Sequence, residues 1–504
     1  MTSPAPPRLA PEPLEPGRPD GASPPAWPRC RRRWWLAPLV LLSVVVGGIG
    51  QTAAAGTVTA YEAVHRLRYG AVSVDDAHLT AALNARRARG VTAVLGRMNA
   101  ALATRDLAGY LATFDGDAGL RRRQTAVFQG LGRMPFALVR YGWNPSRWTR
   151  PLGLSERYGD AAIMAVVTRQ YQLKGWDRAP TGELVAFTFA PKDGRWTVVG
   201  DGTGEGYSLP DDSPVPGPWA FGDVSVLTTA HVLLVGDRAT SRQKDLRRLA
   251  GRIEAVVGDV RSVWPSTTWN GRVVVYALTD RRFLTAWLGD QWSEGEQDDD
   301  TAVTYDAWVS SIDGMAPDGT ATEYPVAGAR MVVTPGMLGS SAEKTRAVVR
   351  HELTHVATAM RGKQAPSWLS EGAAEYTAYR VLRSSGRANG VEALHRRGLP
   401  RQLWSDLRKS SYRPDLVTDH AYFYGGTSDE VDRRYSDSWF AALYIADTYG
   451  EATLRAFYEK ATDPAYAGPA AREEVALRTV LNTDRATFVK RVGEYARALR
   501  RNFQ

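Results

Sequence analysis

The chain has 504 residues, of which 44% are hydrophobic and 23% charged, so it is long enough for two or three ordinary globular domains. Its formal net charge is +9, and part of this excess lies in residues 1–33, which hold six arginines against three acids. No basic stripe interleaved with aromatic residues follows. We therefore expect no nucleic-acid partner. The single cysteine, Cys30, excludes an internal disulfide and a cysteine zinc site.

The N-terminal part predicts a tail and a membrane segment. Residues 1–33 are rich in proline and arginine, and we expect a disordered cytoplasmic tail there. No charge interrupts residues 34–61, a length that can span a bilayer. We therefore expect a transmembrane anchor over 34–56 in the cell membrane, with the rest of the chain extracytoplasmic. The small residues of "TAAAG" leave one alternative, a signal peptide cleaved near Ala55, which would make the protein secreted.

The middle region changes from helical to strand patterns. Apolar residues recur at helical spacing between 73 and 115. Four β-rich segments separated by Gly, Pro or Asp turns follow, at 136–142, 161–173, 183–190 and 195–202. Helices before an antiparallel sheet resemble an NTF2-like (SnoaL-like) α+β cone over 73–208. The region carries no convincing catalytic set, so we interpret it as a spacer or a regulatory binding module.

A second pattern begins after a Pro-, Asp- and Ser-rich linker over 209–217. It predicts, in order, a strand at 225–237, a helix at 244–264, a strand at 271–279 and a further strand at 329–335. The acid-rich segment 293–300 matches no calcium loop and is interpreted as a solvated surface loop.

The segment "RHELTHVATAM" follows the last of these strands. On a helix, His351 and His355 lie one turn apart on the same face, so both imidazoles can bind one zinc ion. Glu352 can reach a metal-activated water as general base without being a ligand. Ser340 with Glu343 predicts a capping box at the start of this helix. With 7 histidines in the chain, H-E-x-x-H arises by chance in roughly one of two hundred such chains, so a second feature is needed.

That second feature is "APSWLSEGAAEYTA" at residues 365–378. Glu371 and Glu375 are four residues apart, on the same face of a second predicted helix. Glu371 can supply the third zinc ligand that a catalytic site needs. Glu375 can accept a hydrogen bond from the far nitrogen of a ligand histidine. The two features together favour a metal site over two ordinary helices.

"HELTH" followed by "WLSEG" resembles the gluzincin zinc metallopeptidases, the clan of thermolysin and aminopeptidase N, and is similar to the bacterial peptidase-MA-like domains. The resemblance covers residues 218–504. It implies zinc (Zn2+) held by His351, His355 and Glu371, with Glu352 as base and Glu375 as a supporting carboxylate. It also implies that an edge strand beside the zinc helix, here expected at 329–334, binds an extended substrate by main-chain pairing.

After Glu375 the sequence is mostly helical. Gluzincins place a tyrosine or histidine near zinc to stabilise the oxyanion. Tyr435 resembles the tyrosine that opens the downstream helix in related domains, and His420, Tyr422 and Tyr424 remain alternatives.

Together these patterns predict an α+β protein: an N-terminal transmembrane helix, an NTF2-like cone, and a gluzincin-type domain with a mixed sheet and a helical C-terminal part. The expected function is hydrolysis of peptide bonds in a protein or peptide substrate. Aminopeptidases of the clan carry a glutamate in a G-x-M-E-N motif, whereas "VAGARMVVTP" has valine at 332 and 333, so we expect an endopeptidase. Glu323 or Asp419 remains a possible substitute for the missing acid. The alternative function is a catalytically silent binding or scaffolding protein that keeps the fold. The patterns do not address oligomeric state.

Overall fold

The computed structural model describes residues 77–151, 153–202, 215–238, 243–265, 269–288, 302–308, 326–359, 365–466 and 468–503. The predicted tail at 1–33, the predicted membrane anchor at 34–56 and all but the end of the linker at 209–217 therefore lie outside the described residues. Among the helices that the structure does describe, none combines the length and the apolar character that crossing a membrane requires. The described residues form a mixed α+β structure, which confirms the predicted class.

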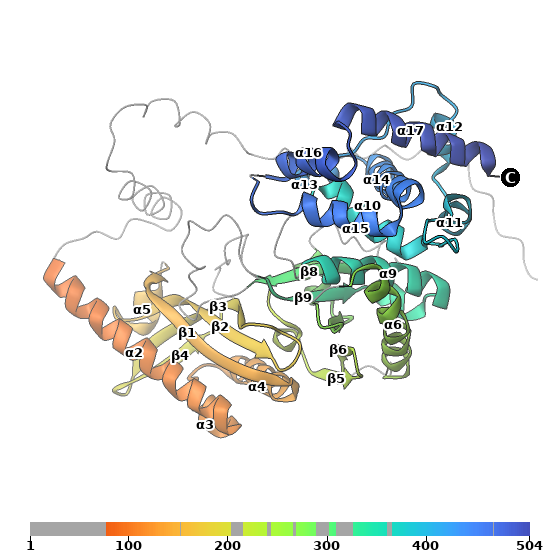
Figure 1. The fold of residues 1–504 in the computed structure, drawn as a ribbon. Helices are drawn as coiled ribbons and strands as arrows, with labels where there is room; N and C mark the ends of the chain where they lie inside the picture. The colour runs from red at the N-terminus through yellow and green to blue at the C-terminus, as the bar shows by residue number, and fades with distance from the viewer. Residues whose placement is uncertain are drawn as a thin grey trace, which may run out of the picture. The chain divides into compact units, whose positions relative to one another are not determined.

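The first sheet is antiparallel and follows a set of helices, as predicted (Figure 1). Its strands pair in chain order: β1 (Phe136–Thr149), β2 (Ile163–Leu173), β3 (Thr181–Lys192) and β4 (Arg195–Gly200). Its helices are α2 (Ala77–Thr104), α3 (Leu107–Leu111), α4 (Ala118–Arg133) and the short α5 (Leu154–Tyr158). Val91, Val94 and Met98 recur at helical spacing and are fully buried, because this face of α2 packs into the same core as Phe187 of the sheet.

The second sheet is mixed, with the order β5-β6-β7-β9-β8. The three inner strands, β6 (Val232–Asp237), β7 (Val273–Ala277) and β9 (Val326–Val333), are parallel and almost wholly buried, which explains their continuous runs of Val, Leu and Ala. The two outer strands, β5 (Val224–Thr228) and β8 (Ala302–Trp308), pair antiparallel with their neighbours. The single strand predicted over 225–237 is therefore the β5–β6 hairpin.

One sequence prediction about this sheet is wrong. The segment expected to form the edge strand at 329–334 lies in β9, which has a neighbour on both sides. The edge beside the histidine-bearing helix is β8, which the sequence patterns did not identify. A fully buried strand with no polar alternation is typical of the middle of a sheet, and this feature distinguishes β9 from an edge.

Helices α6 and α9 pack against the second sheet, and the described residues after it are mostly helical (Figure 1). In order they are η1 (Pro218–Ala220), α6 (Gln243–Val263), α7 (Arg281–Leu288), α8 (Pro335–Gly339), α9 (Ala342–Ala359), α10 (Ser367–Tyr379), α11 (Gly390–Arg397), α12 (Arg401–Asp406), α13 (His420–Phe423), α14 (Ser428–Tyr449), α15 (Glu451–Ala461), α16 (Gly468–Val480) and α17 (Arg485–Asn502). Helix α10 packs between α9 and α14. Gly372 permits this approach, because a Cβ there would lie 2.4 Å from the Ser438 carbonyl oxygen.

The two sheets share a core. Leu131 of α4, Tyr171 of β2 and Trp219 of η1 lie in one buried cluster with Tyr276 of β7 and Val332 of β9. Residues from 69 to 504 accordingly form one compact unit. The predicted domain boundary at 208–218 falls, in the sequence, after the last strand of the first sheet and before the first strand of the second.

Candidate metal centre

Helix α9 carries the first two candidate ligands. Its buried face, with Val349, Leu353 and Val356, packs into the core of the second sheet. His351 and His355 are four residues apart, and their Nε2 atoms lie 3.2 Å from each other. The helix begins one residue later than predicted, at Ala342. The side chain at its start is therefore that of Ser341, whose hydroxyl accepts the Lys344 N–H at 3.2 Å, and the predicted Ser340–Glu343 box is wrong.

Helix α10 brings the third candidate ligand to the same point. Oε2 of Glu371 lies 3.2 Å from Nε2 of His351 and 3.4 Å from Nε2 of His355. A tetrahedral zinc shell with ligand bonds of about 2.0–2.1 Å separates its ligand atoms by about 3.3–3.4 Å. The three atoms thus have the mutual spacing of three corners of such a shell. They are the group of His and carboxylate ligands within the described residues that has the geometry to hold a metal ion.

The outer nitrogens of the two imidazoles face oxygen atoms. Nδ1 of His351 lies 3.1 Å from Oε1 of Glu375, as the sequence predicted. An ionised carboxylate only accepts hydrogen bonds, so Nδ1 carries the proton and Nε2 presents a lone pair. Nδ1 of His355 lies 3.4 Å from Oγ of Ser370, a hydroxyl that can accept a hydrogen bond from it. We assign these tautomers from the partners that each nitrogen faces.

The charges of the centre are compatible with a bound cation. Oε2 of Glu371 is buried, and the groups that face it are Nε2 of His351 and Nε2 of His355. Burying a carboxylate oxygen in this state is costly unless a cation or a proton compensates it. Burial disfavours charge on His351, but Glu371 and Glu375 outweigh this effect and raise its pKa well above the usual value. Nitrogen and carboxylate donors in this number suit zinc.

Glu352 lies beside the centre and is held by the edge strand. Oγ1 of Thr304, on β8, donates to Oε2 of Glu352 at 2.8 Å. Burial raises the pKa of Glu352, and the charges that His351 and His355 can carry oppose this rise only in part. The carboxylate is therefore both positioned and made more basic. Thr304 was missed by the sequence reasoning because β8 itself was missed.

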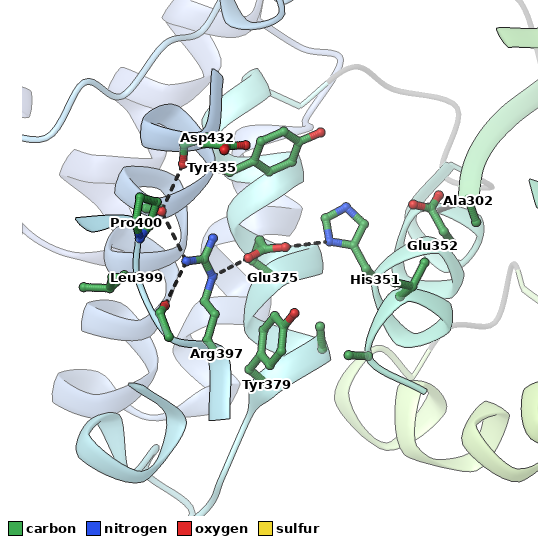
Figure 2. A pocket seen from close by; sticks show the side chains of 15 residues that line it. Ala302, His351, Glu352, Glu375, Tyr379, Arg397, Leu399, Pro400, Asp432 and Tyr435 are labelled. Atoms are coloured by element: carbon green, nitrogen blue, oxygen red, sulfur yellow. Dashed lines mark hydrogen bonds and ion pairs between the residues drawn. The ribbon is translucent and has the colours of Figure 1, made fainter. Parts of the chain in front are cut away.

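An arginine that is mostly shielded from solvent supports Glu375. The Arg397 guanidinium pairs with Oε2 of Glu375 (Figure 2). It also lies 5.1 Å from the ring centroid of Trp439. Burial alone would raise the pKa of Glu375, but Arg397 and His351 bring it down to about 2. Arg397 and Ser370 were also missed by the sequence reasoning. Ser370 immediately precedes Glu371 in "WLSEG", whereas no local signal marks Arg397.

The candidate oxyanion residues lie at different places around the centre. The Tyr435 ring lies 6.1 Å from that of His351, and this residue lines the pocket described below. Tyr424 donates from its hydroxyl to Oε1 of Glu371 at 2.6 Å. Tyr422 is 59% exposed, and His420 is exposed as well. Tyr435 does not open its helix as expected: α14 begins at Ser428, after a capping box formed by Thr427 and Glu430.

A pocket of about 610 Å³ opens beside His351 and Glu352. Figure 2 shows Arg397 and Glu375 on one side of it, with Tyr435 and Asp432 projecting from α14. Its lining residues are Ala302, Ala347, Val348, His351, Glu352, Glu375, Ala378, Tyr379, Arg397, Gly398, Leu399, Pro400, Asp432, Tyr435 and Ser436.

Comparisons with family models, curated proteins and solved structures gave no match to this chain.

Proposed function

We propose that the chain is a zinc-dependent endopeptidase of gluzincin type, with an NTF2-like cone before the peptidase region. The observation that carries the proposal is the triangle of His351 Nε2, His355 Nε2 and Glu371 Oε2, at 3.2–3.4 Å, beside a buried glutamate. The ligand set, the base and an adjacent pocket occur together, as the reaction requires.

Each side chain has a defined part in the proposed reaction. Zinc, when bound, supplies the Lewis-acid chemistry that acidifies water and polarises a carbonyl oxygen. Glu352 would accept the proton of the water that attacks the peptide carbonyl, and would then deliver it to the leaving amine. Thr304 keeps the Glu352 carboxylate in place during both transfers. Tyr435 would donate a hydrogen bond to the oxyanion that forms on the substrate.

The substrate would lie along β8 rather than along residues 329–334. Among the described strands β8 pairs only with β9, and it contacts α9. The side of β8 away from β9, with which no described strand pairs, would then bind an extended segment laid beside Glu352. This arrangement places the scissile bond and its base on neighbouring elements.

The endopeptidase assignment rests on the lack of a carboxylate in β9, where the aminopeptidases of the clan carry the one that binds a free amine. Residues 326–333 of β9 are buried and contain no acid. Asp419 was one candidate for the missing acid, but its carboxylate already accepts a hydrogen bond from the Tyr422 N–H at 2.8 Å, as the N-cap of α13. The other candidate, Glu323, lies outside the described residues. A cationic amino terminus would thus lack a buried partner.

Two substrate series test this assignment. Peptides blocked at both ends and cleavable only internally should be hydrolysed by the zinc-loaded protein, and free amino-acid amides should not. Cleavage that requires a free amino terminus and is abolished by acetylation would show an aminopeptidase instead.

We further propose that the protein is anchored through residues 34–56 with its peptidase region extracytoplasmic, or secreted after cleavage near Ala55. The arginine-rich flank before Trp34 supports this orientation. A reporter that is active only outside the cytoplasm, fused after Gln504, should give signal. Signal from a cytoplasmic reporter at the same position would reverse the orientation.

A further inference from the structure

We infer that the pocket beside Glu352 selects a basic side chain, Lys or Arg, next to the scissile bond, and that Asp432 is the residue that selects it. The inference rests on the proposed peptidase function and adds a substrate class to it. It starts from the lining of the pocket and from the charges that remain unpaired there.

Part of the pocket wall is aliphatic, beside the polar groups that line the rest. Ala347 and Val348 come from α9 and Ala378 from α10, while Leu399 and Pro400 come from the segment after α11. Such walls favour the methylene groups of a long side chain. With a volume of about 610 Å³, the pocket has room for a side chain as large as arginine.

The polar groups of the pocket are mostly engaged with one another. Arg397 pairs with Glu375 and donates to the Ser436 hydroxyl at 3.2 Å. Its side chain is only 11% exposed, so it is not available to bind an acidic substrate group. Glu352 is held by Thr304 and belongs to the reaction. The charge that remains in the lining is the carboxylate of Asp432.

Asp432 is exposed, and its carboxylate makes no ion pair or hydrogen bond with the described residues. Its two arginine neighbours are directed elsewhere. Arg433 pairs with Asp406 at 3.1 Å, and Arg434 donates to the carbonyl oxygens of Phe423 and Gly425. The carboxylate is therefore free to bind a cation that enters the pocket.

The position of Asp432 suits the far end of a long side chain. Asp432, Tyr435 and Ser436 lie on one face of α14, at the spacing i, i+3, i+4, and all three line the pocket. In Figure 2 Asp432 lies well apart from Glu352. A substrate side chain that enters beside Glu352 would lay its methylenes along the aliphatic walls and place its cation near Asp432. A glutamate side chain at this position of the substrate would be repelled by the carboxylates of Glu352 and Asp432.

The test uses blocked peptides that differ at one position next to the scissile bond, with lysine, its uncharged isostere norleucine, or glutamate. The zinc-loaded wild type should show a kcat/KM about fivefold higher for lysine than for norleucine, equivalent to about 1 kcal/mol, and lowest for glutamate. Asp432→Asn should bring the lysine-to-norleucine ratio below about two. Asp432→Lys should favour glutamate over lysine.

Asp429→Asn is the matched control, because Asp429 is exposed on the same helix but does not line the pocket. It should keep the wild-type ratio. Zinc content and folding should be equal in all variants. A lysine preference that persists in Asp432→Asn, or a wild type that cleaves all three peptides equally, would overturn the inference while leaving the peptidase function intact. A zinc-loaded wild type that cleaves no peptide would overturn both.

Discussion

Glu375 connects the candidate metal centre to a cation that is mostly shielded from solvent. Its carboxylate faces Nδ1 of His351 with one oxygen and the guanidinium of Arg397 with the other. This arrangement fixes the ring of His351 and keeps Glu375 ionised, with its pKa at about 2. A carboxylate placed in this way raises the basicity of the nitrogen that would bind the metal.

Replacing Glu375 should therefore weaken metal binding without removing a ligand. We expect Glu375→Gln to lower zinc affinity by about 10–100-fold, and Glu371→Ala to lower it further because a ligand is lost. Competition with a chromophoric chelator measures both affinities. Equal affinities in Glu375→Gln and wild type would show that Glu375 does not support the centre.

Zinc binding should also depend on pH, because the metal competes with protons for the histidines. Glu371 and Glu375 raise the pKa of His351 against the effect of burial, so it becomes protonated at a higher pH than an ordinary histidine. We expect zinc affinity to fall as the pH is lowered, with the fall beginning above about pH 6.5, the ordinary histidine pKa. Titrations at stepped pH measure it. An affinity that stays constant from pH 8 to 5 would contradict the predicted ligand set.

Thr304 offers a separate test of how Glu352 is held. Thr304→Val removes the donor at 2.8 Å and keeps the shape of the side chain. We expect kcat to fall about 2–10-fold, the effect of about 0.5–1.5 kcal/mol for one hydrogen bond, with zinc content and KM little changed. Thr304→Ser should restore most of the rate. A rate that Ser does not restore would point to a packing role for the methyl group.

Spacing along a helix was sufficient to predict two histidines and two glutamates of the centre. Residues four apart share a face, so His351 with His355, and Glu371 with Glu375, followed from local geometry. Thr304 and Arg397 could not be predicted in this way. They come from elements distant in sequence, and tertiary packing alone brings them to Glu352 and Glu375.

The edge strand is the element that links the base to the proposed substrate path. β8 carries Thr304 and pairs with no strand other than β9 in the part of the chain that the structure describes. The sequence predicted the inner strands from their continuous apolar runs but did not identify β8, a short segment after an acid-rich stretch. It also placed the edge one strand too far along the chain. Strand order depends on which neighbours pair, and a run of buried residues does not encode this order.

If the substrate pairs with β8, main-chain N–H groups of the substrate contribute hydrogen bonds to its binding. The test uses blocked peptides that are identical except that each carries one N-methylated amide, at a different position on either side of the scissile bond. KM should rise several-fold where the methylated amide would donate to β8, and should stay unchanged at the other positions. An alternating pattern is expected, because successive groups of a strand point in opposite directions. Methylation with no effect at any position would argue against pairing with this edge.

At the scale of the whole molecule, a buried ion pair joins the two sheets. Asp177, after β2, accepts two hydrogen bonds from the Arg330 guanidinium of β9, at 2.7 and 2.9 Å. The side chains are 0% and 2% exposed. The neighbouring Arg178 N–H donates to the Ala327 carbonyl at 2.8 Å. The middle region therefore contacts the strand that pairs with β8, a relation that no sequence pattern predicted.

Breaking this pair from one side should destabilise the protein strongly. Asp177→Asn leaves the Arg330 charge buried without its partner, and we expect a loss of about 3–5 kcal/mol in the free energy of unfolding. Thermal and urea unfolding measure it. Asp160→Asn is the control, since Asp160 is exposed and lies 4.0 Å from Arg150, and it should change stability by less than about 1 kcal/mol. Equal effects of the two substitutions would contradict the assigned role of the pair.

The most direct test of the central claim compares wild type with Glu352→Gln on a blocked internal peptide, at equal and measured zinc content. Glutamine has nearly the same shape as glutamate but cannot accept the proton of the attacking water. The proposed mechanism predicts that the zinc-loaded wild type cleaves the peptide, and that kcat of the variant falls by at least about 100-fold with zinc still bound. A variant that cleaves at the wild-type rate, or a fully loaded wild type that cleaves no peptide, would contradict the proposed function.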